Sequence, residues 1–507
     1  MRADLLLAID QGTTSTRAVA YDLALKPVAH AARPLETRHP RAGWVEQDPR
    51  QILASLVESV AEVLQAVGPG RIAAVGLDNQ GETVVAWDAE SGRALAPAIS
   101  WQCRRSEAIV ERLRAAGHGS AVRRRTGLPL DPYFSAGKMT WLLEEVLEVG
   151  RARQEGRLRL GTVDAWLTAQ LGGEPLTDPS TASRTQLFDL HRLAWSEELL
   201  DLFGVPAQTL PRLVGSAGRL GILRHPTWDG AELPLTALAC DQQAALAGHG
   251  AFEPGGIKAT YGTGVFVLAT TGSTPPQHGE QLLGTVAWQL ADGTTTYALD
   301  GGVFTAGTLL GWLTDGLGVL DDAQASEALA RSVPNDGGVL LLPALAGLGA
   351  PWWRPEARGV IAGISAATRR GHVVRAALDG IANRVADVVE AMIETTAQSP
   401  EALRVDGGLS KNAYLLERQA DLLGLPVDVA SAAESTALGI AGLAGIGAGL
   451  IGPEAITAAN PVARRIHPRS AVNTRERERE AWRSFLVQAA ELTIFDGDRR
   501  DASPSKT

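Results

Sequence analysis

Cysteine is scarce in this chain of 507 residues, which contains only Cys103 and Cys240. The two lie far apart with no second thiol near either, so the sequence offers neither a disulfide framework nor a zinc-binding pattern. An apolar run near the N-terminus, residues 5–9, is too short for the core of a secretory signal peptide. We therefore expect a protein of the reducing cytoplasm.

The sequence also lacks an excess of basic residues. Its 47 Lys and Arg are outnumbered by 57 Asp and Glu, which gives a formal net charge of -10. A protein that binds the phosphate backbone of a nucleic acid relies on a basic surface, so we expect no nucleic-acid partner. With 45% hydrophobic and 21% charged residues, the composition excludes a mostly disordered or fibrous chain.

Long hydrophobic runs are few. Residues 435–452 carry no charge over about the length of a membrane span. The glycines in this run and Pro453 after it favour a closely packed core helix instead. We therefore expect no insertion into a membrane.

The length of the chain predicts two domains, since a single core normally serves about 150 residues. A glycine-rich stretch without periodicity, residues 248–256, marks the boundary between them. We expect domains over residues 1–250 and 251–495, and a disordered tail over residues 496–507.

Two hairpins of similar pattern are predicted, one over residues 5–22 and one over residues 257–270. In each, an apolar run leads into a polar turn and then into a second run. The helices are expected at residues 50–67, 106–116, 138–149, 370–396 and 415–423, and short strands at residues 72–77 and 339–342. Alternating charges at residues 475–480 predict a solvated helix face. This mixture of elements indicates an α/β fold.

The turn of the first hairpin, residues 10–15, has the chemistry of a phosphate-binding turn. Its glycine lets the backbone approach a phosphate, its hydroxyls and amides can donate to phosphate oxygens, and Asp10 can hold a divalent cation. Alone, the segment is equally typical of a polar hairpin turn. Glycine-rich turns recur at residues 261–264 and 406–408, and the three together predict a nucleotide cleft.

Asp241 follows the apolar run 235–238, at the predicted carboxyl end of a strand, where α/β proteins bind ligands. A carboxylate there can take the proton of a hydroxyl that attacks a phosphoryl group. The plainer interpretation is a helix N-cap. Polar groups and aromatic rings also gather around Glu82, Trp101 and Tyr133, a mixture typical of pockets for polyols and sugars.

Taken together, these segments resemble the FGGY carbohydrate kinases, and within that family the glycerol kinases, from residue 5 to about residue 450. The likeness is carried by residues 8–17, 43–49, 131–135, 178–184, 241–245, 260–264, 347–352 and 404–408. The resemblance implies an α/β fold of two actin-like, ribonuclease-H-type domains that close on MgATP and a polyol. It also implies a homodimer or homotetramer.

The same resemblance implies a set of site residues. Asp241 would be the catalytic base, and Asp10 would lie at the metal. The residues implied for the nucleotide are Thr13, Thr14, Ser15, Arg17, Thr263, Gly307, Gly408 and Asn412. Those implied for the polyol are Glu82, Trp101, Tyr133, Asp241, Gln242 and Phe266. The first domain would then carry the polyol and phosphate side of the cleft, and the second the adenine side.

One position departs from the glycerol kinase pattern, because Gly81 stands where that pattern has an arginine. Loss of a guanidinium removes charge-assisted hydrogen bonds and is expected to open room for a further carbon or two. We expect phosphorylation of glycerol to glycerol 3-phosphate, with a tetritol, a pentitol or a ketose as the alternative substrate. An actin-like or chaperone-like ATPase and a catalytically silent polyol sensor are the more distant alternatives.

Overall fold

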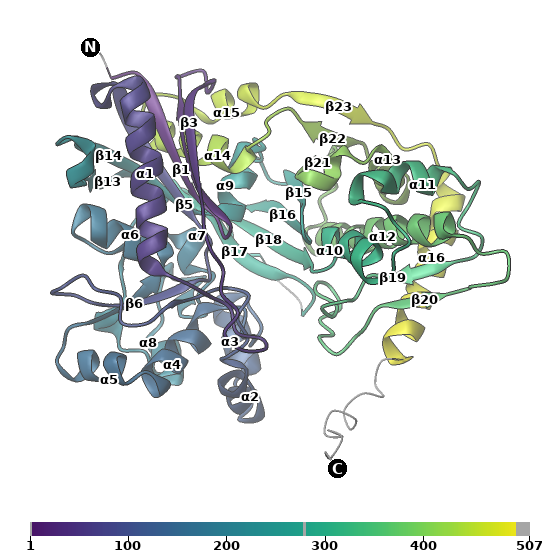
Figure 1. The fold of residues 1–507 in the computed structure, drawn as a ribbon, viewed down its shortest axis with the longest axis horizontal. Coiled ribbons are helices and arrows are strands. Elements are labelled where there is room, and N and C mark those ends of the chain that lie inside the picture. Colours follow the sequence, from purple (N-terminus) through teal and green to yellow (C-terminus); the bar gives the residue numbers. More distant parts are fainter. Residues whose placement is uncertain (1–2, 277–279, 493–507) are drawn as a thin grey trace.

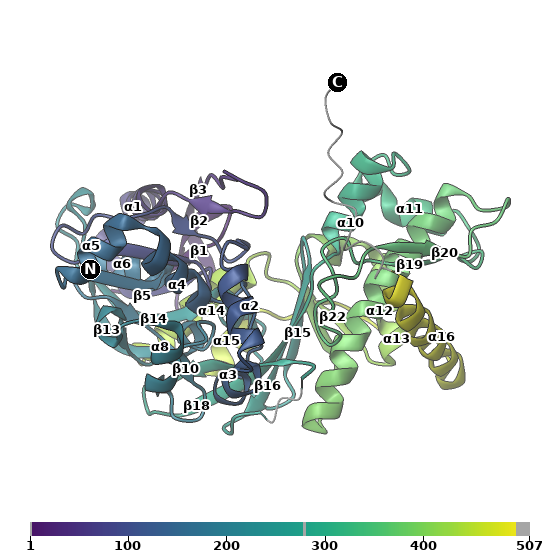
Figure 2. The ribbon, with the colours of Figure 1, turned by 90° about the horizontal axis from the view of Figure 1, so that it is seen from below.

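The computed structural model describes residues 3–276 and 280–492. The chain forms two large sheets, each flanked by helices. The two sheets with their helices lie side by side and make up the two halves of the molecule (Figures 1 and 2). The predicted two-domain α/β fold is confirmed. The predicted tail over residues 496–507 lies outside the described residues, and the predicted domain limits stay a prediction.

The first sheet contains the predicted N-terminal hairpin, whose strands pair antiparallel. From edge to edge its strands are β13 (Ala217–Leu223), β14 (Leu233–Cys240), β5 (Ile72–Asn79), β1 (Leu5–Gln11), β2 (Ser15–Tyr21) and β3 (Pro27–Pro34). Strands β14, β5 and β1 run parallel, so their carboxyl ends meet at one edge of the sheet. This edge brings the end of β1 beside the residues that follow β5 and β14.

Helices cover both faces of the first sheet (Figure 1). Helix α1 (Pro49–Val67) packs on one face, while α9 (Asp241–Gly248) and α14 (Ser435–Gly447) pack on the other. A Cβ atom on Gly439 of α14 would lie only 1.8 Å from the carbonyl oxygen of Ala244 in α9, so this close crossing needs a glycine. The prediction of a packed core helix is thus confirmed. Within the described ranges, no helix has both the length and the apolar character to cross a membrane.

The second sheet repeats the hairpin as β15 and β16, as predicted. From edge to edge its strands are β17 (Leu283–Gln289), β18 (Thr295–Val303), β16 (Val265–Gly272), β15 (Ile257–Tyr261), β21 (Leu403–Asp406), β22 (Val427–Ala430) and β23 (Val462–Ile466). Helix α12 (Arg370–Thr396), which has the predicted bounds, lies in the core of this half. Other elements of this half are α10 (Gly307–Gly311), α11 (Ser326–Arg331), β19 (Leu340–Leu342), β20 (Val360–Ala362), α13 (Ala413–Leu423) and α16 (Val472–Glu491). Helix α15 (Pro453–Ala459) packs on α14 and α9 instead.

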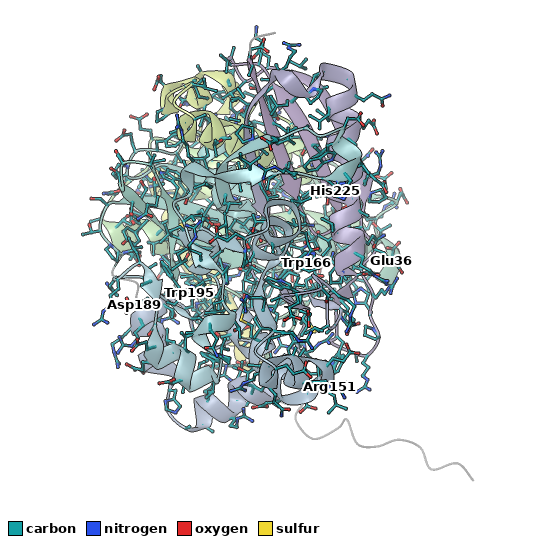
Figure 3. The ribbon with its side chains drawn as sticks, turned by 90° about the vertical axis from the view of Figure 1, so that its left-hand side faces the viewer. Glu36, Arg151, Trp166, Asp189, Trp195 and His225 are labelled. Atoms are coloured by element: carbon teal, nitrogen blue, oxygen red, sulfur yellow. The ribbon has the colours of Figure 1, made fainter. Side chains whose placement is uncertain are left out.

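A smaller four-stranded sheet and several short helices complete the first half. The strands are β4 (Glu46–Gln47), β7 (Ala98–Ile99), β6 (Val84–Asp88) and β8 (Leu158–Thr162). The helices are α2 (Glu107–Ala115), α3 (Gly119–Thr126), α4 (Ser135–Glu145), α5 (Leu147–Gln154), α6 (Val163–Gly172), α7 (Pro179–Ala182) and α8 (Glu197–Phe203). Trp166 of α6, labelled in Figure 3, packs edge-on against Trp87 of β6 with ring centroids 5.7 Å apart. The remaining short strands form two pairs, β9 (Leu176–Thr177) with β12 (Arg212–Leu213) and β10 (Phe188–Asp189) with β11 (Ala194–Trp195).

Two predictions of local structure were wrong in part. The helix predicted over residues 138–149 is broken between α4 and α5, because Val146 has an extended backbone. The charged run at residues 475–480 lies in α16 as a helix, but its face is not wholly solvated. Arg479 is only 3% exposed, and its guanidinium donates to Asn383, Asp387 and Glu390 of α12.

Replacing Arg479 with Met should lower the free energy of unfolding by about 3–5 kcal/mol, because it leaves the buried carboxylate of Asp387 with one guanidinium partner fewer. Arg477→Met is the matched control, since Arg477 is exposed and donates to a backbone carbonyl of its own helix. Urea denaturation of both variants measures the difference. Equal midpoints would show that α16 is not anchored by this cluster.

Candidate active site

A pocket lies where the carboxyl-end edge of the first sheet faces β16 of the second. Residues of both halves line it: Thr13, Gln80, Gly81, Glu82, Trp101, Tyr133, Arg184, Cys240, Asp241, Gln242 and Phe266. The six residues predicted for the polyol are therefore brought together in one place. Thr13, predicted for the nucleotide, lies among them.

Asp241 is the first residue of α9, directly after β14. Its Oδ1 accepts a hydrogen bond from the backbone amide of Gln242 at 2.7 Å, and the Cys240 sulfur lies 3.5 Å from the same oxygen. Burial raises the pKa of Asp241 to about 7, with the charges of Glu82 and Asp10 adding to the effect. A carboxylate with this pKa can accept a proton at neutral pH and release it again.

Arg184 is a pocket residue that the sequence did not assign to the site. Its Nε donates to Glu82 at 2.7 Å, and its Nη1 lies 2.9 Å from Oδ2 of Asp300 in β18. Burial alone would lower the pKa of Arg184, but the charges of Glu82 and Asp300 outweigh it and raise this pKa well above the ordinary value. The pocket therefore contains a permanently charged guanidinium, which reaches it from the segment after α7.

The room expected beside Gly81 is filled, so that expectation was wrong. Gly81 lies in the turn between β5 and β6, and a Cβ atom there would lie 2.5 Å from the sulfur of Cys240. It would also lie 3.5 Å from Cγ of Arg184. The Cys240 thiol thus occupies the space in which a side chain at position 81 would begin.

Several pocket side chains are held by hydrogen bonds. Lys258 donates from Nζ to the amide oxygen of Gln242 at 2.7 Å, which turns the amide NH₂ group away from Lys258. The indole Nε1 of Trp101 donates to the hydroxyl of Thr13 at 2.9 Å. The Trp101 ring also meets the Tyr133 ring edge-on, with centroids 5.6 Å apart. These contacts fix the amide and the aromatic surfaces before any ligand enters.

The other residues predicted for the nucleotide lie outside this pocket. Three turns and the strand start beside one of them carry most of these residues: Thr14 lies between β1 and β2, Ser15 begins β2, Thr263 lies between β15 and β16, and Gly408 follows β21. β15 and β21 are parallel neighbours, so their turns adjoin, and the amide of Gly307 at the start of α10 donates to Gly262 in the first of these turns. The side chain of Asn412 is used structurally, since it caps α13 and donates to Ser326.

Two carboxylates lie side by side at the end of the first sheet. Asp10 of β1 is in register with Asp78 of β5, and the buried carboxyl group of Asp78 lies within hydrogen-bonding reach of Asp10. Burial raises the pKa of both groups, and for Asp78 the neighbouring charge of Asp10 raises it further. Across residues 3–276 and 280–492, no cluster of three or more His, Cys, Asp or Glu side chains is arranged to hold a metal ion. Asp10 is also 3.9 Å from Arg17, whose guanidinium pairs with Glu434.

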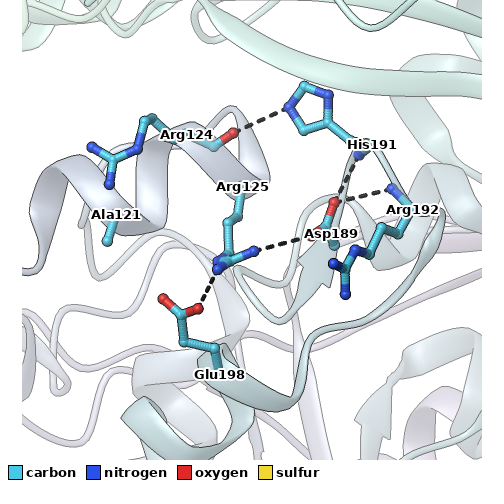
Figure 4. Close-up of a pocket in the computed structure, with 7 residues that line it drawn as sticks. All are labelled: Ala121, Arg124, Arg125, Asp189, His191, Arg192 and Glu198. Carbon is cyan, nitrogen blue, oxygen red and sulfur yellow. Dashed lines mark hydrogen bonds and ion pairs between the residues drawn. The ribbon is translucent and has the colours of Figure 1, made fainter.

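A second concavity lies between α3, the β10–β11 turn and α8 (Figure 4). Arg125 pairs there with Asp189 at 3.5 Å and with Glu198. Asp189 also accepts from the backbone amides of His191 and Arg192. Asp189 and Glu198 hold α3 to the turn and to α8, so we assign this concavity no part in the chemistry.

Comparison with known proteins matches residues 5–248 to the N-terminal domain and residues 257–448 to the C-terminal domain of the FGGY family of carbohydrate kinases. The chain belongs to the FGGY family of carbohydrate kinases. The family prediction is therefore confirmed, and the FGGY kinase fold accounts for the two halves described above.

Individual relatives of this FGGY kinase match over nearly the whole chain. A glycerol kinase of Citrifermentans bemidjiense is 46% identical over 491 residues, which cover 95% of this chain and 98% of that protein. A glycerol kinase of Aromatoleum aromaticum is 44% identical, with 96% and 98% covered. The crystal structure of Plasmodium falciparum glycerol kinase with ADP superposes with a TM-score of 0.91 at 30% identity, covering 96% of this chain and 98% of that one.

This FGGY kinase also contains a buried lysine beneath the pocket. Lys138 of α4 donates from Nζ to the backbone carbonyls of Glu82, Tyr133 and Phe134, and burial lowers the pKa of Lys138 to about 8. Two of these three carbonyls belong to pocket residues. Lys138 therefore holds the Glu82 turn and the segment of Tyr133 in one arrangement.

Lys138→Met should lower the free energy of unfolding by at least about 2 kcal/mol, because buried carbonyl oxygens lose their donor. Thermal or urea denaturation measures this change, and Lys26→Met at an exposed site is the control. A Lys138→Met protein as stable as the control variant would contradict the anchoring role.

Proposed function

We propose that this chain is a glycerol kinase, which transfers the γ-phosphoryl group of ATP to a primary hydroxyl of glycerol. The observation that carries the proposal is the convergence of Asp241, Glu82, Gln242 and three aromatic rings in one pocket. Glycerol kinases that match nearly the whole chain support it. The filled space beside Gly81 argues against the longer polyols, and the family argues against a chaperone-like ATPase.

In this proposal the pocket grips the polyol through fixed polar groups. Glu82 uses Oε1 to accept from Arg184, which leaves Oε2 to accept a hydrogen bond from a hydroxyl. Gln242 offers its NH₂ group as a donor, because Lys258 occupies its oxygen. The rings of Trp101 and Phe266 pack against the carbon atoms. Since these groups are already oriented, little conformational entropy is lost when the polyol binds.

Asp241 takes the role of general base. As the attacking hydroxyl oxygen bonds to the γ-phosphorus, its proton passes to the Asp241 carboxylate, the bond to the bridging oxygen breaks, and ADP leaves with that oxygen. The raised pKa of Asp241 suits this task, because the group is basic enough to hold the proton and is substantially ionised at neutral pH. Asp241 then returns the proton to water.

In this proposal the phosphates of ATP bind at the turns of the two hairpins, where the donors are Thr13, Thr14, Ser15, Arg17 and Thr263. The adenosine binds near Gly307, Gly408 and Asn412. A magnesium ion would neutralise phosphate charge when bound, and Asp10 near the carboxyl end of β1, with Asp78 beside it, would suit an ion that prefers one or two carboxylates plus phosphates. Two further parts of the proposal rest on the sequence: a cytoplasmic location, in keeping with the free thiols, and a homodimer or homotetramer.

A coupled ADP-release assay with MgATP tests the substrate. Glycerol should give the highest kcat/KM in a series with erythritol, threitol, ribitol and dihydroxyacetone, and ATP turnover should require the polyol. Asp241→Asn should reduce kcat at least about a hundredfold, since it removes the base. Asp201→Asn, at an exposed position of α8, is the control. Turnover of a longer polyol with silence on glycerol would refute the proposal.

The activity should fall on the acidic side of pH 7. Asp241 acts in its ionised form, and its raised pKa of about 7 means that this form is lost as the pH falls through 7. We expect kcat/KM for glycerol to decline tenfold for each pH unit below this midpoint. Glu82→Gln removes one charge that raises this pKa, so the midpoint should move to lower pH. Measurements of kcat/KM between pH 5 and 9 for both proteins test this prediction. If the pH midpoint of kcat/KM is the same in Glu82→Gln as in the wild type, the prediction is wrong.

A further inference from the structure

Position 81 and position 240 compete for one space in the pocket wall. Gly81 has no side chain, and the Cys240 sulfur lies 2.5 Å from the point where a Cβ atom on residue 81 would be. Real side chains do not approach so closely, so the two positions cannot both carry large groups in this arrangement. Gly81 is not in the left-handed backbone region, so space alone forbids a side chain there.

The Cys240 thiol therefore forms part of the pocket wall next to Asp241. Cys240 ends β14, is 2% exposed, and lines the pocket together with Gly81 and Asp241. Burial raises the pKa of Cys240 well above its ordinary value, so the thiol is neutral and donates weakly to Asp241. Its sulfur takes up volume beside the hydroxyl that Asp241 would deprotonate.

We propose that Cys240 and Gly81 form a specificity pair, in which the Cys240 thiol takes the place of a side chain at position 81 and limits the pocket to a three-carbon polyol. This inference rests on the proposed function. Removing the sulfur atom leaves space next to Asp241 for one more carbon and its hydroxyl. Since one methylene in a pocket changes discrimination by about 10- to 200-fold, the thiol is large enough to set the length of the substrate.

Cys240→Ala tests the length limit. The ratio of kcat/KM for erythritol to that for glycerol should rise at least about tenfold over the wild type. Cys103→Ala is the matched control, because Cys103 is equally buried but its sulfur meets Arg105 outside the pocket. An unchanged ratio in Cys240→Ala would overturn the proposal.

A double-mutant cycle tests the shared space. Gly81→Ala should lower both the melting temperature and kcat/KM for glycerol when Cys240 is present, because the new methyl group meets the sulfur. In the Cys240→Ala background the same change should lower the melting temperature and kcat/KM only slightly, since the Cβ atom of residue 240 lies 3.5 Å from the new atom. Equal effects in the two backgrounds would overturn the proposal.

The two claims fail separately. A wild-type protein that turns over no polyol would refute the proposed function, and the melting temperatures of the four proteins in the cycle would still show whether positions 81 and 240 share one space. A wild type active on glycerol with an additive cycle would refute the specificity pair alone.

Discussion

The buried ion triad of Glu82, Arg184 and Asp300 is the interaction on which the pocket depends. Each member is at most 5% exposed, and the triad joins the turn after β5, the segment after α7 and strand β18 of the second sheet. Charges in such surroundings are costly unless they stay paired, so the three elements are held to one geometry. Glu82 belongs both to this triad and to the lining of the pocket, so the constraint fixes part of the pocket wall.

The local sequence pattern predicted those parts of the fold whose structure is decided by residues that are close together in the chain. Both hairpins were predicted because an apolar run, a polar turn and a second run are contiguous in the sequence. Helix α12 was predicted with the observed bounds, since a long periodic segment has few alternatives. The break at Val146 was missed, because no glycine or proline marks it and the backbone there follows from packing.

Long-range pairs account for what the sequence could not predict. Arg184 acquires its place from partners 102 and 116 residues away, and nothing near it in the sequence identifies them. Arg479 sits in a run of alternating charges that is normally solvated, and only the packing of α16 on α12 buries it. The effect of Gly81 was misjudged for the same reason, because Cys240 fills the space from another strand. The pocket positions of Gln242 and Phe266 came from the resemblance, while Glu82, Trp101, Tyr133 and Asp241 were also indicated by their own chemistry.

The position of α14 bears on how the protein is made. Its apolar surface completes the first sheet, against Leu6, Ala8 and Ala237, yet it is encoded almost 200 residues after that sheet's last strand, β14. During synthesis part of one apolar face of the first sheet, the part that α9 does not cover, therefore stays exposed until residue 447 has left the ribosome. A gene cut at the family-model boundary near residue 250 would yield a fragment with that face exposed, which invites aggregation. The two family domains are thus contiguous in sequence, while the core of the first sheet is completed by a helix of the second family domain.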